Sequence, residues 1–146
     1  MHYYLSLGSN LGDREQTLRE ALTHIEQQIG PVLRCSSFFY SEPWGFDSPH
    51  PFCNLCCSVE TNKTPQEVLC LTQTIERALG RTQKSPITNH QSSIIHYADR
   101  CIDIDIIRVF DVDKEVFIST PDLTIPHRFW QERAFVKVPL EEIMQK

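Results

Sequence analysis

Two stretches of the chain carry apolar residues at helical spacing. The first stripe has intervals of seven, four, three and four: Leu11, Leu18, Leu22, Ile25 and Ile29. We expect this helix to begin near Asn10 or Asp13 and to end at Gly30, which a proline follows. The second stripe has intervals of three, four and four: Val68, Leu71, Ile75 and Leu79. Thr64 and Glu67 have the spacing of a capping box, which predicts where the second helix begins.

Segments rich in strand-forming residues flank the two stripes. They are residues 2–8, 32–41, 52–61 and 99–107, with residues 115–119 as a further candidate. The resulting order β-α-β-β-α-β is typical of the ferredoxin-like α+β class, an antiparallel sheet with both helices on one face. We therefore expect one domain over residues 1–146, a second sheet face that is free, and short helical additions near the C-terminal end.

Two polar segments interrupt this pattern. Residues 42–51 read "EPWGFDSPHP" and predict a proline-rich loop. Residues 81–99 are polar and irregular, and segments of that length inside a compact domain are usually lids, binding loops or disordered. We interpret residues 81–99 as a lid loop, since closing a lid expels water and strengthens charge interactions; the sequence leaves open whether it closes.

The clearest chemical signal is a pair of aspartates within a run of isoleucines. If residues 99–107 form a strand, Ile102, Ile104 and Ile106 share one face while Asp103 and Asp105 share the other. Two carboxylates on one face disfavour each other's ionised form, so a cation or a donor should compensate them. Hard oxygen ligands favour Mg²⁺, which commonly uses one or two carboxylates together with phosphates and water.

The spacing alone is not specific, because an ordinary solvent-facing strand also places acidic residues this way. Asp111 and Asp113 repeat the D-x-D spacing without the isoleucines. If metal binds at the first pair, two Mg²⁺ ions could brace the attacking and leaving oxygens of an in-line displacement. Positioning and charge neutralisation would then dominate a phosphoryl-type transfer.

Composition narrows the possible partners. The chain has 146 residues, of which 40% are hydrophobic and 23% charged, values typical of a globular domain. Its net charge of −5 provides no basic footprint for nucleic acid and no polybasic segment for an anionic membrane. The beginning "MHYYLSLGSN" lacks the features of a secretory signal, so we expect a cytoplasmic protein.

The six cysteines could suggest disulfides or zinc. They occur at positions 35, 53, 56, 57, 70 and 101. Period-2 geometry distributes the thiols of "FCNLCCSVE" over both faces of a strand, and no second C-x-x-C follows. We interpret all six as small buried hydrophobic residues.

Several other residues could contribute to a site. Candidate cations for a phosphorylated ligand are Arg81, Lys84, Arg100, His127, Arg128 and Arg133. Aromatic residues that could stack on a flat heterocycle are Trp44, Phe46, Phe52 and Phe135, although such rings are more often core. Asn54 lies in a hydrophobic strand, where its amide needs partners that a ligand could supply. Walker A, dinucleotide-binding and zinc-protease motifs are absent from the sequence.

The motifs together resemble the 6-hydroxymethyl-7,8-dihydropterin pyrophosphokinase family. "YADRCIDIDII" is similar to its signature, in which an arginine and two spacer residues precede D-[hydrophobic]-D. Further blocks agree in the same order: "LSLGSNLGDRE", "SSFFYSEPWG", "FCNLCCSVET", "TQTIERALGR", "TIPH" and "ERAF". The resemblance implies transfer of pyrophosphate from ATP to the hydroxymethyl group of a reduced pterin, with release of AMP, in folate biosynthesis. It implies small-molecule substrates and requires no oligomer.

The resemblance also implies roles for residues at the matching positions. Asp103 and Asp105 would bind two Mg²⁺ ions that bridge the ATP phosphates, and Asp105 would help to deprotonate the attacking hydroxyl. The catalytic set is completed by Arg81 and Arg100. Nucleotide and phosphate contacts would come from Gln73, Glu76, Tyr97, Thr124, His127 and Arg133. Pterin contacts would come from Ser41, Pro43, Trp44, Phe52, Asn54 and Phe135, with Phe52 and Phe135 as the two rings that enclose the pterin.

Two other functions are compatible with parts of the pattern. A metal-dependent nucleotide-sugar transferase also uses D-x-D to hold a cation on a diphosphate, but it normally needs a larger nucleotide-binding domain. A ferredoxin-like regulatory or ligand-binding module without catalysis would need no metal at the acidic strand. Formation of AMP from ATP in the presence of the pterin distinguishes both from a pyrophosphokinase.

Overall fold

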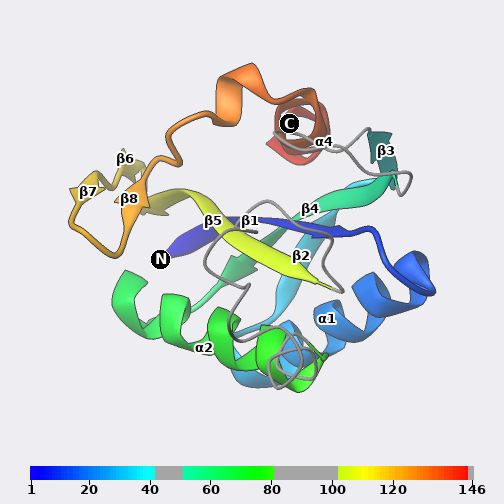
Figure 1. Ribbon diagram of the computed structural model, residues 1–146. Helices are drawn as coiled ribbons and strands as arrows, with labels where there is room; N and C mark the ends of the chain where they lie inside the picture. The colour runs from blue at the N-terminus through cyan, green and yellow to red at the C-terminus, as the bar shows by residue number, and fades with distance from the viewer. Residues whose placement is uncertain (42–50, 81–101, 145–146) are drawn as a thin grey trace.

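The computed structural model describes residues 1–41, 51–80 and 102–144. Its middle layer is an antiparallel six-stranded sheet in the order β2-β4-β1-β5-β6, with β3 also paired to β4 (Figure 1). The strands of this sheet are β1 (His2–Ser9), β2 (Val32–Cys35), β3 (Phe39–Ser41), β4 (Phe52–Glu60), β5 (Asp103–Asp111) and β6 (Lys114–Glu115). Strands β7 (Ile118–Ser119) and β8 (Thr124–Ile125) form a separate pair.

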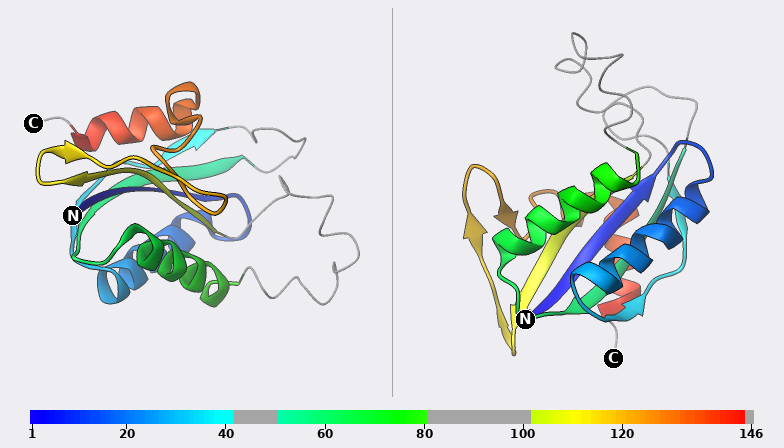
Figure 2. Two further views of the ribbon diagram at one scale, coloured as in Figure 1. Left: turned by 90° about the vertical axis from the view of Figure 1, so that its left-hand side faces the viewer. Right: turned by 90° about the horizontal axis from the view of Figure 1, so that it is seen from below.

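The helices lie on both sides of this sheet. They are α1 (Arg14–Gln28), α2 (Pro65–Ala78) and α4 (Ala134–Met144), with a 3-10 turn η3 (Trp130–Glu132) before α4. Figure 2 shows α1 and α2 on one face and α4 on the other. The predicted ferredoxin-like α+β arrangement is confirmed, with β1 between β4 and β5. Among the described residues, no helix is long and apolar enough to cross a membrane.

Both predicted helices begin at their predicted caps. Asp13 is the N-cap of α1, and its side chain accepts a hydrogen bond from the backbone of Gln16. Thr64 and Glu67 form the complete capping box of α2. Leu11 precedes α1 instead of belonging to its stripe, because Asp13 starts the helix after it. These caps satisfy backbone N–H groups that a helix cannot satisfy internally.

The main core lies between the sheet and the two first helices. Its fully buried members include Tyr3, Leu5, Leu7, Leu18, Ile25, Leu55, Val59, Val68, Ile75 and Ile102. The expectation of a free second face is wrong, because α4 packs there. Its apolar stripe makes a second cluster with the sheet: Cys56, Ile107, Val136, Leu140 and Ile143. Covering this face leaves only part of it for a ligand.

The second predicted strand is divided in two. Residues 32–41 form β2 and β3, separated by a short segment around Ser36. The backbone of Cys56 donates to Ser36 Oγ at 2.9 Å, while Ser36 N–H donates to the Cys56 carbonyl at 2.8 Å. A serine hydroxyl thus takes a backbone partner that a regular ladder would use. Residues 115–119 are likewise divided between β6 and β7.

The cysteine prediction is only partly correct. Cys53, Cys56 and Cys57 are buried, whereas Cys35 and Cys70 are exposed, and all five are free thiols. Cys35 is exposed because it ends β2 at the edge of the sheet, where β4 pairs on one side only. Cys101 lies outside the described residues. Burial raises the pKa of the Cys56 thiol to about 12, which keeps it protonated at neutral pH.

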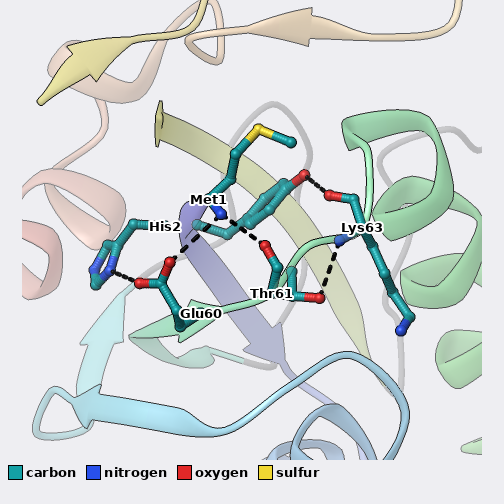
Figure 3. A network of polar contacts seen from close by, with 6 residues as sticks. Met1, His2, Glu60, Thr61 and Lys63 are labelled. Carbon is teal, nitrogen blue, oxygen red and sulfur yellow. Dashed lines mark hydrogen bonds and ion pairs between the residues drawn. The ribbon is translucent and has the colours of Figure 1, made fainter. Parts of the chain in front are cut away.

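A polar network fixes the N-terminal end of β1 (Figure 3). The Met1 ammonium donates to the Thr61 carbonyl at 2.7 Å, and the His2 ring contacts Glu60 at 3.0 Å. The Tyr3 hydroxyl donates to the Lys63 carbonyl at 2.6 Å. These contacts join β1 to the segment after β4, at the end of β1 remote from Gly8. They hold the register of the central strands.

Candidate active site

The two aspartates share one face of β5, as predicted. Asp103 pairs with Gly8 of β1, and Asp105 pairs with Ser6. The neighbouring isoleucines on the opposite face are 0–4% exposed and join the main core. Both aspartates are half-buried on the other face. At about 3.3 Å per residue, their Cα atoms lie about 7 Å apart.

A β-bulge follows the acidic pair. Tyr4 pairs with Arg108 while Leu5 pairs with Ile106, so Ile107 is the additional residue. Ile107 packs in the cluster beneath α4, whereas Val109 packs in the main core. The bulge therefore changes which residues face α4 beyond Asp105, and Arg108 joins the α4 face. Bulges of this kind often redirect a side chain beside a functional site.

Glu76 of α2 supports the strand between the two aspartates. Its Oε2 accepts the backbone N–H of Ile104 at 2.7 Å, and its side chain is only 6% exposed. Strand β6 pairs with β5 only at Phe110 and Asp111, so this carboxylate serves as the acceptor for Ile104. The family resemblance places Glu76 among the nucleotide contacts, whereas this hydrogen bond joins it to β5.

Replacing Glu76 with alanine should weaken the fold and the site together. The Ile104 N–H would lose its acceptor in a buried position, which costs about 1–3 kcal/mol. Glu76→Gln keeps an acceptor oxygen and should lose less stability. Urea unfolding of both variants, followed in the same buffer, measures the difference. Equal losses for alanine and glutamine would show that the hydrogen bond is not the source of the effect.

His127 lies beside the aspartate strand. Its backbone N–H donates to the Ile107 carbonyl at 2.8 Å, and its ring is electrostatically coupled to Asp103. Burial and the Arg133 charge lower the pKa of His127, while Asp103 acts in the opposite sense. The imidazole is therefore neutral at neutral pH, and it can act as a hydrogen-bond donor through one ring nitrogen.

Arg133 is held by two aromatic rings. Its guanidinium carbon lies 5.5 Å from the Phe129 ring centroid and 5.8 Å from that of Phe135. At these distances the ring faces attract the guanidinium by cation–π interactions, and its charge is retained. Phe135, one of the two predicted pterin rings, thus adjoins a cation that is coupled to His127.

Asn54 lies on the same face of the sheet, across β1 from the acidic pair. Its amide donates to the Phe39 carbonyl at 3.0 Å and to Ser41 Oγ at 2.8 Å. Both amide hydrogens are therefore used inside the protein, so the group that Asn54 can offer a ligand is its carbonyl oxygen. The protein itself thus supplies partners of the Asn54 amide that the sequence analysis expected from a ligand.

Gly8 joins the two halves of the site. It pairs with Asp103 on one side and with Asn54 on the other. A Cβ at position 8 would lie 2.9 Å from Asn54 Oδ1 and 3.5 Å from the Phe52 ring. The strand pattern of residues 2–8 places Gly8 at its end but gives it no role in the site. A glycine inside a strand pattern is a signal for close approach of another group, and it could have indicated this position.

The other predicted site residues are distributed as follows. Gln73 is exposed on α2, one turn before Glu76, and Thr124 is exposed on β8. Ser41 pairs with Phe52. Five assignments lie outside the described residues: Pro43, Trp44, Arg81, Tyr97 and Arg100. The predicted lid over residues 81–99 lies outside them as well.

The donor set at Asp103 and Asp105 fits a magnesium ion better than a transition metal. Within residues 1–41, 51–80 and 102–144, no group of three or more His, Cys, Asp or Glu could hold a metal. A cation at the two carboxylates would therefore complete its coordination with water or with a ligand's oxygens. That is how Mg²⁺ is usually bound beside substrate phosphates.

Comparison with known proteins identifies the family of the chain. Residues 4–145 match the family model of 7,8-dihydro-6-hydroxymethylpterin-pyrophosphokinase (HPPK). A Porphyromonas gingivalis protein named 2-amino-4-hydroxy-6-hydroxymethyldihydropteridine pyrophosphokinase is 44% identical over 96% of this chain and 88% of its own length. Proteins of the same name from Bacillus subtilis and Aquifex aeolicus are 36% and 32% identical, over 98% and 96% of this chain and 78% of each relative. The chain therefore belongs to the 7,8-dihydro-6-hydroxymethylpterin-pyrophosphokinase family.

Proposed function

We propose that Asp103 and Asp105 bind two Mg²⁺ ions together with the triphosphate of ATP, and that this arrangement carries the activity of the family. The chain is a pyrophosphokinase of folate biosynthesis that uses ATP as its co-substrate. The acceptor is the hydroxymethyl group of 6-hydroxymethyl-7,8-dihydropterin. The observation that carries the metal assignment is the common face of the two aspartates on β5.

The transfer is an in-line displacement. The pterin hydroxyl oxygen attacks the β-phosphorus of ATP, the bond from that phosphorus to the oxygen bridging to the α-phosphorus breaks, and AMP leaves. The hydroxyl proton passes to Asp105 and then to water. Bound Mg²⁺ would neutralise phosphate charge and orient the attacking and leaving oxygens. The protein's main contribution is to position the reactants and to provide complementary charge.

Side chains beside the aspartate strand could bind the phosphates during this transfer. The Arg133 guanidinium lies beside the rings of Phe129 and Phe135, and guanidinium groups suit phosphate oxygens. The neutral imidazole of His127 can donate a hydrogen bond to a phosphate oxygen. Because it carries no charge, it leaves charge neutralisation to the metal. Arg81, Arg100 and Tyr97 are proposed as further contacts by their motif positions, as are Gln73 and Thr124 for the adenosine side.

We propose that the pterin binds beside Asn54, on the other side of Gly8 from the aspartates. The carbonyl oxygen of Asn54 would accept from an N–H group of the pterin, while the rings of Phe52 and Phe135 would stack on its two faces. Ser41 holds the Asn54 amide in this orientation. Pro43 and Trp44 are proposed as neighbours by motif position. The acceptor hydroxyl would then lie on the side of β1 that adjoins Asp103 and Asp105.

Product analysis tests this function. The chain is mixed with ATP, Mg²⁺ and 6-hydroxymethyl-7,8-dihydropterin, and the nucleotides are separated at several times. We expect AMP and a diphosphorylated pterin to form in equal amounts. Formation of ADP would indicate an ordinary kinase, and the absence of turnover would favour a ligand-binding module without catalysis.

A further inference from the structure

Arg108 contacts four parts of the chain around the α4 face. Its Nε and Nη2 donate to the two carboxylate oxygens of Glu115 at 2.9 and 2.8 Å, a bidentate pair. Its Nη1 lies 3.6 Å from the sulfur of Met144. The side chains of Arg108 and Glu115 are only 20% and 19% exposed. Bidentate geometry and partial burial make this pair stronger than a surface ion pair.

The same guanidinium lies between two rings. Its central carbon is 5.0 Å from the Phe110 ring centroid and 5.2 Å from the Trp130 ring centroid. Phe110 belongs to β5, whereas Trp130 belongs to the η3 turn. We call Arg108, Phe110, Glu115 and Trp130 the arginine clamp. It joins the strand that carries the aspartates to the turn before α4.

The turn held by this clamp carries the proposed phosphate contacts. Trp130 is three residues after His127 and three before Arg133. The backbone of Trp130 contacts the His127 carbonyl at 3.4 Å, and the backbone of Val136 donates to the Arg133 carbonyl at 2.9 Å. Phe129, the residue before Trp130, has its ring centroid 5.5 Å from the Arg133 guanidinium carbon. The position of Trp130 therefore constrains the backbone that carries His127 and the ring that contacts Arg133.

Arg108 acts at a distance from the aspartates. It follows Asp105 by three residues, so their Cα atoms lie about 10 Å apart along the strand. The α4 cluster, which includes Trp130 and Phe135 at its margin, occupies the face beside it. Arg108 would therefore influence the reaction through the elements that it holds in place, not by direct contact with the reactants.

We propose that Arg108 is a positioning residue for the nucleotide half of the site, because the arginine clamp fixes the turn that directs His127 and Arg133 toward the aspartate strand. The inference rests on the proposed roles of His127 and Arg133 in binding phosphate. Arg108→Met would keep the aliphatic stem but lose the bidentate fork and the charge beside the two rings. Arg108→Lys would keep the charge, but it cannot make a bidentate pair with Glu115.

The main test uses Arg108→Met combined with Glu115→Gln. The second change avoids leaving a partly buried carboxylate without its partner, which would itself destabilise the fold. Initial rates at varied MgATP give kcat and KM, calorimetry with α,β-methylene-ATP gives nucleotide affinity, and thermal unfolding reports the fold. We expect kcat/KM for MgATP to fall by about ten- to a hundredfold, because misplaced contacts cost that much, while the unfolding temperature changes little.

Further variants separate positioning from general stability. Arg108→Lys should fall between wild type and the double variant. Trp130→Leu should reproduce the loss of kcat/KM. Because the two residues contact each other, Arg108→Met combined with Trp130→Leu should lose less than the sum of the two separate losses. Arg19→Met is the matched control, because Arg19 also lies over a ring, that of Phe38 at 5.6 Å, on the other side of the sheet. It should leave kcat/KM unchanged.

Two results would overturn the inference, and they differ from failure of the proposed function. Wild-type kcat/KM in Arg108→Met/Glu115→Gln, with large losses in His127→Ala and Arg133→Ala, would remove the role of Arg108 alone. Wild-type values in all of these variants would remove the proposed phosphate contacts as well. If the double variant does not fold, Arg108→Lys and Trp130→Leu decide the question, and additive losses in kcat/KM would contradict a shared clamp.

Discussion

Asp105→Ala should lower the rate of AMP formation by about a thousandfold or more while the protein stays folded. The loss is that expected when a group that organises charge in the transition state is removed from a partly enclosed site. The fold should tolerate the change, because Asp105 faces away from the main core and its neighbours Ile104 and Ile106 keep their packing. Steady-state rates and thermal unfolding of the same preparation measure both effects.

The chain contains its own control for this substitution. Asp111 and Asp113 have the same D-x-D spacing, but both are exposed, Asp111 at the end of β5 and Asp113 in the turn after it. Asp111→Ala should keep the wild-type rate. A near-normal rate for Asp105→Ala, or an equal loss for Asp111→Ala, would contradict the assignment of the site to this part of β5.

Gly8→Ala should impair use of the pterin more than binding of the nucleotide. A Cβ at position 8 would lie 2.9 Å from Asn54 Oδ1, closer than real Cβ atoms come to such a group, so the amide must move. Displacing the proposed pterin acceptor should lower kcat/KM for the pterin by about ten- to a hundredfold. Varying each substrate in turn measures the effect, and calorimetry with α,β-methylene-ATP and Mg²⁺ should give nearly wild-type affinity.

Ser9→Ala is the matched control for the glycine variant. It changes the next residue of β1, whose buried hydroxyl has no hydrogen-bond partner in the described part of the chain. Removing it should cost little, because no hydrogen bond is lost there. If Gly8→Ala kept the wild-type kcat/KM for the pterin, the proposed position of the pterin beside Asn54 would be wrong.

Much of the fold could be predicted from short-range patterns. The stripes at Leu18 and Val68 and the caps at Asp13 and Thr64 depend on neighbours within a few residues, and the structure confirms them. The alternation of Ile104 and Asp105 is likewise a local property of a strand. Such signals survive folding because tertiary packing reinforces them.

The features that the sequence missed depend on distant contacts. The division of residues 32–41 arises where Ser36 binds the backbone of Cys56, twenty residues later. The bulge at Ile107 appears only when β5 is aligned with β1. The bidentate pair of Arg108 with Glu115 requires β6 to fold back on β5, and its contact with the Trp130 ring requires the turn before α4 to lie over the sheet. Local propensity has no information on these pairings.

In the candidate site, too, some features follow from the local sequence and others depend on distant contacts. The aspartate pair could be found from spacing and parity, and the family motif directed attention to Asn54, His127 and Arg133. The position of Gly8 between Asn54 and Asp103 could not be found without the sheet order. The same holds for the use of both Asn54 amide hydrogens inside the protein, which leaves its carbonyl oxygen for a ligand.

If Asp103 and Asp105 hold the metal, nucleotide binding at β5 should depend on magnesium. Calorimetry would compare α,β-methylene-ATP with and without Mg²⁺, for the wild-type chain and for Asp103→Asn/Asp105→Asn. We predict that Mg²⁺ raises the affinity of the wild-type chain by about tenfold or more, within the usual range of coupling between two ligands, and that the double variant loses this increase. Equal affinity in excess chelator, or an undiminished increase in the double variant, would contradict the claim that these two carboxylates hold the metal.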